Sequence, residues 1–169
     1  PYRREMLQRL GLPFQCVSPN IDETPAPGES PSQLALRLSV AKAQAVARLH
    51  PHAVVIGSDQ VATLADQPIG KPGNFENARK QLRQLSGQRV LFHSALCVHS
   101  GQRTLVEDVI TTCTFRALSD DEIDFYLERE KPFDTAGSAK AEGLGIALME
   151  SMHSDDPTAI IGLPLIALS

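Results

Sequence analysis

The sequence predicts a mixed α/β fold with a central sheet that is partly antiparallel. Three runs of apolar and β-branched residues are typical of strands: 54–64, 90–99 and 104–115. Helix signals alternate with these runs, and capping boxes that begin at Ser30 and Ser119 mark two helix starts. A turn at Ser100 and Gly101 joins the last two runs into a hairpin, which makes that part of the sheet antiparallel.

Residues 2–49 contain two predicted helices and one short predicted strand. Residues 2–10 form a helix that ends at Gly11, because glycine readily adopts the left-handed conformation of a helix cap. We expect a strand over 13–17 and a loop over 18–30, where Pro, Asp, Glu and Gly are frequent. The next helix runs from the Ser30 cap to about residue 49.

The rest of the chain alternates helices with the predicted strands. Residues 74–86 form a helix with Gly87 just past its end. A further helix runs from the Ser119 cap to about residue 130. Small residues dominate 135–145, and residues 160–169 form the start of a last helix.

Composition limits the class of protein. With 169 residues and no linker or repeat, the chain is expected to form a single domain over 1–169. A net charge of −4 argues against a partner that is a nucleic acid polymer, and no apolar run approaches the roughly 20 residues that cross a membrane. Three cysteines without C-x-x-C spacing fit a reducing cytoplasm: Cys16, Cys97 and Cys113.

Asp59 interrupts the buried strand pattern V-V-I-G-S-D-Q-V-A-T-L. Aspartate is a poor strand former, so its presence in this run needs a reason. One interpretation is a general base or a metal ligand, and the other is an aspartate that caps a turn after the strand. The residues alone leave both interpretations open.

Three cations are candidates for binding phosphate. Lys71, in the rigid segment G-K-P, either reaches a phosphate or is a solvated loop lysine. Lys42 flanks the apolar stripe of its helix, which fits a ligand-binding lysine and equally a lysine whose stem covers apolar surface. Arg3, beside Arg4, either binds an anion near a helix start or belongs to the solvated surface.

Carboxylates outside the strands are further candidates. Asp22 and Glu23 lie in the proline-bounded loop, where they either hold a hard cation such as Mg²⁺ or belong to a solvated turn. Glu142 is surrounded by small residues that let a ligand approach the backbone, and the alternative is a surface glutamate in a glycine-rich loop. The chain has no P-loop motif and no complete dinucleotide fingerprint.

Several segments, in specific order and spacing, resemble the Maf family of nucleoside triphosphate pyrophosphatases over essentially the whole chain. These segments are PYRREML, IDETP, the KA of Lys42, GSDQV, GKP, LSG, AGSAKAEG and IGLPL. The resemblance implies a Maf/ITPase-like fold, in which helices flank a mixed, twisted central sheet and a cleft lies between two lobes. Such proteins are often homodimers. A strand and a Ser-x-Ser segment precede PYRR in the family, so we expect that the N-terminal strand and the C-terminal end are missing here.

The resemblance implies hydrolysis between the α- and β-phosphates of a nucleotide, which gives a monophosphate and diphosphate. Asp59 then matches the proton acceptor. The cations around the triphosphate are matched by Arg3, Lys42 and Lys71. Glu23, together with Asp59, matches the acidic residues linked to a divalent cation such as Mg²⁺ or Mn²⁺. A triphosphate requires this concentration of positive charge before water attacks phosphorus.

Three further positions bear on which base is accepted. In the family branch that acts on dTTP and UTP, these positions look like P-R-R, S-D-T and K-x-Q-G. This chain instead has Tyr2, Gln60 and Glu142. These residues resemble the branch that acts on 7-methyl-GTP. Guanine presents two donors that a carboxylate such as Glu142 accepts together. Methylation at N7 adds positive charge, which favours an aromatic face such as Tyr2.

We therefore expect a cytoplasmic enzyme that removes 7-methyl-GTP before polymerases use it. One alternative is a pyrophosphatase for dTTP, UTP or other non-standard nucleotides. Another is a nucleotide-binding regulator of septum formation that need not hydrolyse its ligand.

Overall fold

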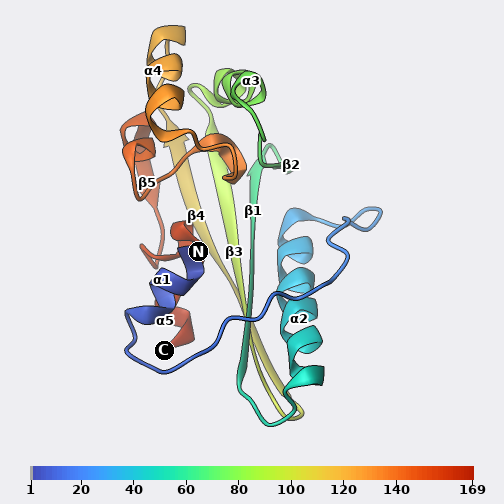
Figure 1. Ribbon diagram of the computed structural model, residues 1–169. Coiled ribbons are helices and arrows are strands. Elements are labelled where there is room, and N and C mark those ends of the chain that lie inside the picture. The colour runs from blue at the N-terminus through green and yellow to red at the C-terminus, as the bar shows by residue number, and fades with distance from the viewer. Residues whose placement is uncertain (1) are drawn as a thin grey trace. The chain divides into compact units, whose positions relative to one another are not determined.

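The computed structural model describes residues 2–169 and confirms the mixed α/β class. Its five-stranded sheet has the order β2-β1-β3-β4-β5 (Figure 1). The strands are β1 Val55–Leu64, β2 Gln67–Ile69, β3 Arg89–Ser100, β4 Arg103–Phe115 and β5 Met149–His153. The α-helices are α1 Tyr2–Gln8, α2 Pro31–Leu49, α3 Phe75–Leu85, α4 Asp120–Glu130 and α5 Leu165–Leu168. Three 3₁₀ helices complete the fold: η1 Ala136–Ser138, η2 Leu144–Leu148 and η3 Ala159–Ile161.

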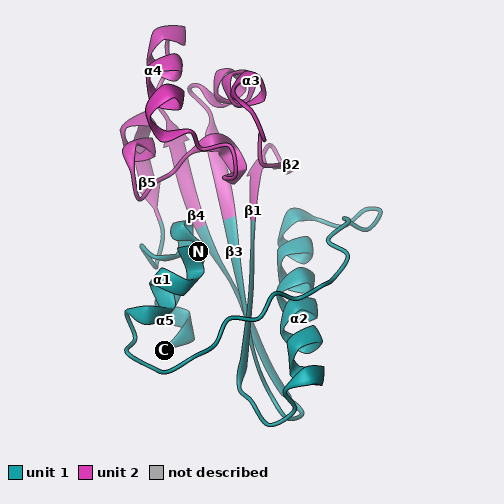
Figure 2. Ribbon diagram, in the orientation of Figure 1, with its two compact units in different colours: residues 1–60, 93–110, 154–169 teal, residues 61–92, 111–153 magenta. Residues whose placement is uncertain are grey.

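The chain divides into two compact units (Figure 2). Unit 1 comprises residues 1–60, 93–110 and 154–169, and it contains α1, α2, η3 and α5. Unit 2 comprises residues 61–92 and 111–153, and it contains β2, α3, α4, η1, η2 and β5. Strands β1, β3 and β4 contribute residues to both units.

In unit 1, different helices cover the two faces of the sheet (Figure 1). Leu96 of β3 packs in a cluster with Met6 of α1 and Leu165 of α5. The next residue, Cys97, packs with Ala43 of α2. Because successive side chains of a strand point to opposite faces, α2 covers one face, and α1 and α5 cover the other.

The same alternation fixes the orientation of the residues along β1. Val55 packs in the cluster under α2, whereas Ile56 packs against the cluster under α1 and α5. Asp59 therefore faces α2, and its neighbours Ser58 and Gln60 face the other side of the sheet.

Gly57 allows α2 to approach β1 closely. A Cβ atom at this position would meet the Ser39 carbonyl oxygen, and it would lie only 2.8 Å from the Ala43 backbone nitrogen. Ser39 and Ala43 are both fully buried in α2. At the start of the same helix, the Ser32 hydroxyl donates a 2.8 Å hydrogen bond to Asp108 of β4. These contacts hold α2 in one position against the sheet.

Unit 2 is organised by α3 and α4, which pack against each other. Ala78, Leu82 and Leu85 form the buried side of α3, as the sequence predicts. The predicted capping boxes at the starts of α2 and α4 are confirmed, with Ser30 and Ser119 as the capping residues.

The structure differs from the predicted elements in three respects. Pro13–Val17 is not a strand, because no described strand pairs with it and the segment instead lines a hollow in unit 1. The short strands β2 and β5 were not predicted; β2 contains a proline, and Met149–His153 lacks a clear alternation. The final helix is also shorter than expected, because Gly162 adopts a φ of 126° and Pro164 follows before α5 begins.

Two further properties concern the environment of the chain. Among residues 2–169, no helix combines the length and the apolar character needed to cross a membrane. All three cysteines are free, and Cys97 and Cys113 are buried. Burial raises the pKa of the Cys113 thiol to about 12, so this thiol stays protonated in the folded protein.

The packing at Gly57 predicts a large stability effect for Gly57→Ala. We expect the variant to lose about 1–3 kcal/mol of unfolding free energy, because the added methyl group overpacks the contact with α2. Urea denaturation measures this change. Gly70→Ala is the control, since a Cβ there meets nothing within 4 Å. Equal stability of the two variants would contradict the proposed close contact.

Candidate active site

Lys42 is the centre of a charged cluster in unit 1. Its Nζ atom lies 2.7 Å from Asp59 Oδ1 and 2.9 Å from Glu23 Oε1. The Lys42 side chain is only 14 % exposed and that of Asp59 only 12 %, so water screens their attraction weakly. The structure therefore brings together three residues that the sequence marks as functional candidates, from a loop, a helix and a strand.

The position of Asp59 excludes one of its two interpretations. The residue lies in the middle of β1, is 8 % exposed and bonds to a helix lysine. The interpretation as a turn-capping aspartate is therefore wrong. Only one of its carboxylate oxygens is engaged by Lys42, and the described residues give Oδ2 no partner.

Arg3 lies beside this cluster. Its Nε donates a 2.9 Å hydrogen bond to the Gly162 carbonyl. Protein atoms displace water from around the guanidinium, and this desolvation lowers the pKa of Arg3. The nearby negative charges of Asp59 and Glu23 act in the opposite direction. Since an arginine stays protonated in proteins, the side chain adds a fixed positive charge next to the two carboxylates.

Asp22 and Glu23 are neighbours in the loop before α2, but their side chains bond to different partners. Asp22 Oδ1 accepts hydrogen bonds from the hydroxyl and the backbone nitrogen of Thr24, and these bonds lower the pKa of Asp22. Asp22 thus stabilises a local turn, whereas Glu23 reaches Lys42. Arg37 of α2 fastens the same loop through a 3.1 Å bond to the Thr24 carbonyl and an ion pair with Glu29.

Gln60 faces the opposite side of β1 and binds η3. Its Nε2 donates to the Ile160 carbonyl over 2.9 Å, to the Ala159 carbonyl over 3.3 Å and to the Ser94 hydroxyl over 3.2 Å. Ser94 itself donates to the Ala159 carbonyl over 2.6 Å. The amide group of Gln60 is therefore held in one orientation, and the structure gives its carbonyl oxygen no partner among the described residues.

Two hollows in unit 1 differ in what lines them. The first, here called the Lys42 hollow, has a volume of ≈ 670 Å³, and its lining includes Arg3, Glu23, Lys42, Ser58 and the segment 13–19. This volume lies within the range of small-molecule sites.

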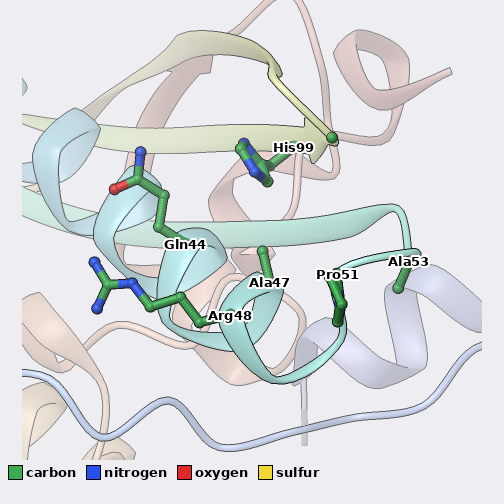
Figure 3. A pocket seen from close by; sticks show the side chains of 7 residues that line it. Gln44, Ala47, Arg48, Pro51, Ala53 and His99 are labelled. Atoms are coloured by element: carbon green, nitrogen blue, oxygen red, sulfur yellow. The ribbon is translucent and has the colours of Figure 1, made fainter.

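The second hollow, of ≈ 390 Å³, contains none of the predicted residues (Figure 3). Its lining comes from the end of α2, the loop that follows and the β3–β4 hairpin: Gln44, Ala47, Arg48, Pro51, Ala53, His99 and Gly101. Glu23 and Lys42 of the charged cluster therefore line the larger hollow, and Asp59 bonds to Lys42 beside it.

Lys71 belongs to unit 2, in the segment before α3. Its side chain is exposed, but the backbone on both sides is fixed by α3. Gln81 donates to the Gly70 carbonyl over 3.0 Å, and Asn77 donates to the Pro72 carbonyl over 3.1 Å. The lysine is therefore presented from an ordered backbone, and its role in binding phosphate stays a prediction.

Tyr2 and Glu142 are the remaining predicted residues. Tyr2 begins α1 and precedes Arg3, while Pro1 of the same segment lies outside the described residues. Glu142 is exposed in unit 2, in the turn between η1 and η2. Their roles in recognising the base stay predictions.

The carboxylates of the cluster fit a divalent cation in type and number. Mg²⁺ is commonly bound by one or two carboxylates, with water and substrate phosphates as the other ligands. Glu23 and Asp59 each use one oxygen on Lys42 and keep the other oxygen without a partner among the described residues. Within residues 2–169, no group of three or more His, Cys, Asp or Glu side chains could hold a metal ion by itself.

Sequence reasoning missed two hydroxyl groups that act on the face of β1 opposite the cluster. Ser58 donates to the carbonyls of Ala95 and Gly162, at 2.8 and 3.0 Å, and Ser94 helps to hold Gln60. Gly162 accepts from Arg3 as well, so one carbonyl connects the C-terminal turn to two elements. The S-D-Q sequence was the only signal, because the partners are far apart in the chain.

The fold agrees with comparisons to known proteins. The sequence profile described as Maf-like protein matches residues 1–169. The chain therefore belongs to the Maf-like protein family.

Close relatives are named "7-methyl-GTP pyrophosphatase". The relative from Bordetella avium (strain 197N) is 71% identical over 168 residues, which cover 99% of this chain and 85% of the relative. The one from Bordetella pertussis (strain Tohama I) is 67% identical, with 99% and 84% covered. The one from Ralstonia nicotianae (strain GMI1000) is 60% identical over 171 residues, with 100% and 88% covered.

The hydrogen bonds of Gln60 predict that Gln60→Glu destabilises the protein. The new carboxylate would face the carbonyls of Ala159 and Ile160, so we expect a loss of about 1–3 kcal/mol near neutral pH. The loss should shrink at acidic pH, where a protonated carboxyl group donates again. Urea denaturation at both pH values measures the effect. Gln44→Glu, on the exposed side of α2, is the control; equal stability of both variants would contradict the network.

Proposed function

We propose that the chain is a nucleoside triphosphate pyrophosphatase that hydrolyses 7-methyl-GTP to 7-methyl-GMP and diphosphate. The observation that carries the proposal is the cluster of Glu23, Lys42 and Asp59, with Arg3 beside it, at the Lys42 hollow. The names of relatives at 57–71% identity support the same substrate.

The charges of the cluster explain how it would receive a triphosphate. The positive charges of Arg3 and Lys42 are balanced by Glu23 and Asp59 when no ligand is bound. A triphosphate brings several negative charges, so further positive charge is needed. Lys71 is the candidate on the protein side, and a divalent cation held by Glu23 and Asp59 would supply the rest by neutralising phosphate oxygens.

Asp59 would act as the proton acceptor. Its carboxylate is fixed by Lys42 at one oxygen, which leaves the other oxygen to orient a water molecule. The water oxygen attacks one of the two phosphorus atoms of the α–β bridge, and the bond from that phosphorus to the bridging oxygen breaks. 7-Methyl-GMP and diphosphate separate, and the proton of the water moves to the carboxylate. Lys42 and Arg3 would stabilise the negative charge that develops on the phosphate oxygens.

Glu142, Gln60 and Tyr2 would select the base. The exposed carboxylate of Glu142 can accept both donors on the Watson–Crick edge of guanine. The free carbonyl oxygen of Gln60 offers a further acceptor, and Tyr2 offers an aromatic face for the cationic methylated ring. A pyrimidine lacks this pair of donors, which favours 7-methyl-GTP over UTP.

We also propose that the enzyme acts in the cytoplasm as a homodimer. Three free cysteines support a reducing compartment, and the family resemblance supports the dimer. Light scattering coupled to size-exclusion chromatography tests the oligomeric state.

Asp59→Asn should abolish hydrolysis without preventing folding. The amide keeps the shape of the side chain but does not accept a proton, so we expect turnover of 7-methyl-GTP to fall by about 10²- to 10⁴-fold. Release of diphosphate in the presence of Mg²⁺ or Mn²⁺ measures the reaction. Asp66→Asn, in the exposed turn after β1, is the matched control and should keep normal turnover.

Undiminished hydrolysis by the Asp59 variant would show that another group accepts the proton. The same variant addresses the regulator alternative: a cellular effect on septum formation that persists without hydrolysis would favour nucleotide binding as the function.

Glu142→Gln should change base preference. Glutamine offers one donor and one acceptor in place of two acceptors, so we expect the ratio of kcat/KM for 7-methyl-GTP over UTP to fall by about tenfold or more. Steady-state kinetics with both nucleotides measure this ratio. An unchanged ratio would refute the assignment of Glu142 to base recognition.

A further inference from the structure

The turn that contains Glu142 is hydrogen-bonded to α4 on both sides of that residue. The backbone nitrogen of Lys140 donates a 3.0 Å hydrogen bond to the Tyr126 hydroxyl. The backbone nitrogen of Leu144 donates to the Glu130 carboxylate. Tyr126 and Glu130 are one helical turn apart, so they lie on the same face of α4. Glu142 lies midway between the two anchored amides.

Between these anchors the backbone forms a tight turn. The Gly143 nitrogen donates a 3.0 Å hydrogen bond to the Lys140 carbonyl, which makes Glu142 the third residue of a β-turn. A Cβ atom at Gly143 would lie 2.5 Å from Glu130 Oε1, and a Cβ at Gly145 would meet the Lys140 backbone. Gly143 is therefore required because the turn lies close to Glu130 of α4, and Gly145 because the chain there lies close to the Lys140 backbone.

Tyr126 is a rigid anchor. It is 1% exposed, and its hydroxyl also donates a 2.7 Å hydrogen bond to the Ser138 carbonyl. Burial raises the pKa of the Tyr126 phenol, and the negative charges of Glu130 and Glu142 act in the same direction. The phenol thus stays a neutral donor, and the carboxylate of Glu142 lies near enough to influence it.

We propose that Tyr126 and Glu130 are positioning residues that orient Glu142 and thereby set the selectivity among nucleobases. The proposal rests on the proposed role of Glu142 in recognising guanine. A glutamate accepts two donors of a base together only if its backbone is held in a narrow range of positions. An exposed turn without anchors would leave the carboxylate mobile, and the distinction between a purine with two donors and a pyrimidine would weaken.

The test compares four variants of the whole protein by kcat/KM for 7-methyl-GTP and for UTP with Mg²⁺. Tyr126→Phe removes the hydroxyl with little change in volume. Glu130→Ala removes the acceptor for Leu144, whereas Glu130→Gln retains an acceptor oxygen. Glu128→Ala is the matched control, because Glu128 is exposed on α4 and bonds to no described residue.

We expect Tyr126→Phe and Glu130→Ala to lower the 7-methyl-GTP to UTP ratio by about fivefold or more, towards the ratio of Glu142→Gln. The kcat/KM for UTP should stay within about twofold of the parent value. Glu130→Gln should keep most of the selectivity, and Glu128→Ala all of it. If Tyr126→Phe does not fold, the three variants at Glu130 and Glu128 decide the question.

Two outcomes overturn the proposal while the proposed function stands. One is an unchanged ratio in Tyr126→Phe and Glu130→Ala when Glu142→Gln lowers it. The other is an equal loss with both nucleotides, which indicates a purely structural role. An unchanged ratio in Glu142→Gln itself refutes base recognition by this residue, and the positioning role falls with it.

Discussion

The close contact between α2 and β1 at Gly57 is the constraint on which the charged cluster depends. Only a residue without a side chain lets the helix backbone come this near the strand. Lys42 precedes Ala43, one of the residues in that contact, and Asp59 lies two residues beyond Gly57 on the same face of β1. A helix held farther away would leave the Lys42 amine short of the carboxylate. Packing therefore sets the 2.7 Å pair, and the pair in turn fixes Asp59.

The opposite face of β1 is organised by the carbonyl groups of the turn around η3. Ser58, Gln60 and Ser94 all donate to this turn, and Arg3 donates to the same Gly162 carbonyl as Ser58. The C-terminal segment thus positions both a strand and the first helix. Asp59 is oriented by its bond to Lys42 of α2, whereas its neighbours Ser58 and Gln60 are held by the turn around η3. The two faces of β1 are therefore fixed by different parts of the chain.

Much of the fold follows from local sequence signals, and most of the site does not. The capping boxes at Ser30 and Ser119 predict the starts of α2 and α4 because the bonds involved are local. Pro13–Val17 misled the prediction, since an extended segment becomes a strand only if another strand pairs with it. Likewise, Asp22 and Glu23 look equivalent in sequence, and only the tertiary contact with Lys42 separates them.

The most direct measurement is a crystal structure of the protein with Mg²⁺ and an analogue of 7-methyl-GTP whose α–β bridging oxygen is replaced by a methylene group. We predict that the triphosphate chain occupies the Lys42 hollow, with Lys42 and Arg3 on phosphate oxygens and Asp59 beside the bridging group. Binding of the triphosphate in the hollow lined by Arg48 and His99, away from Asp59, would contradict it.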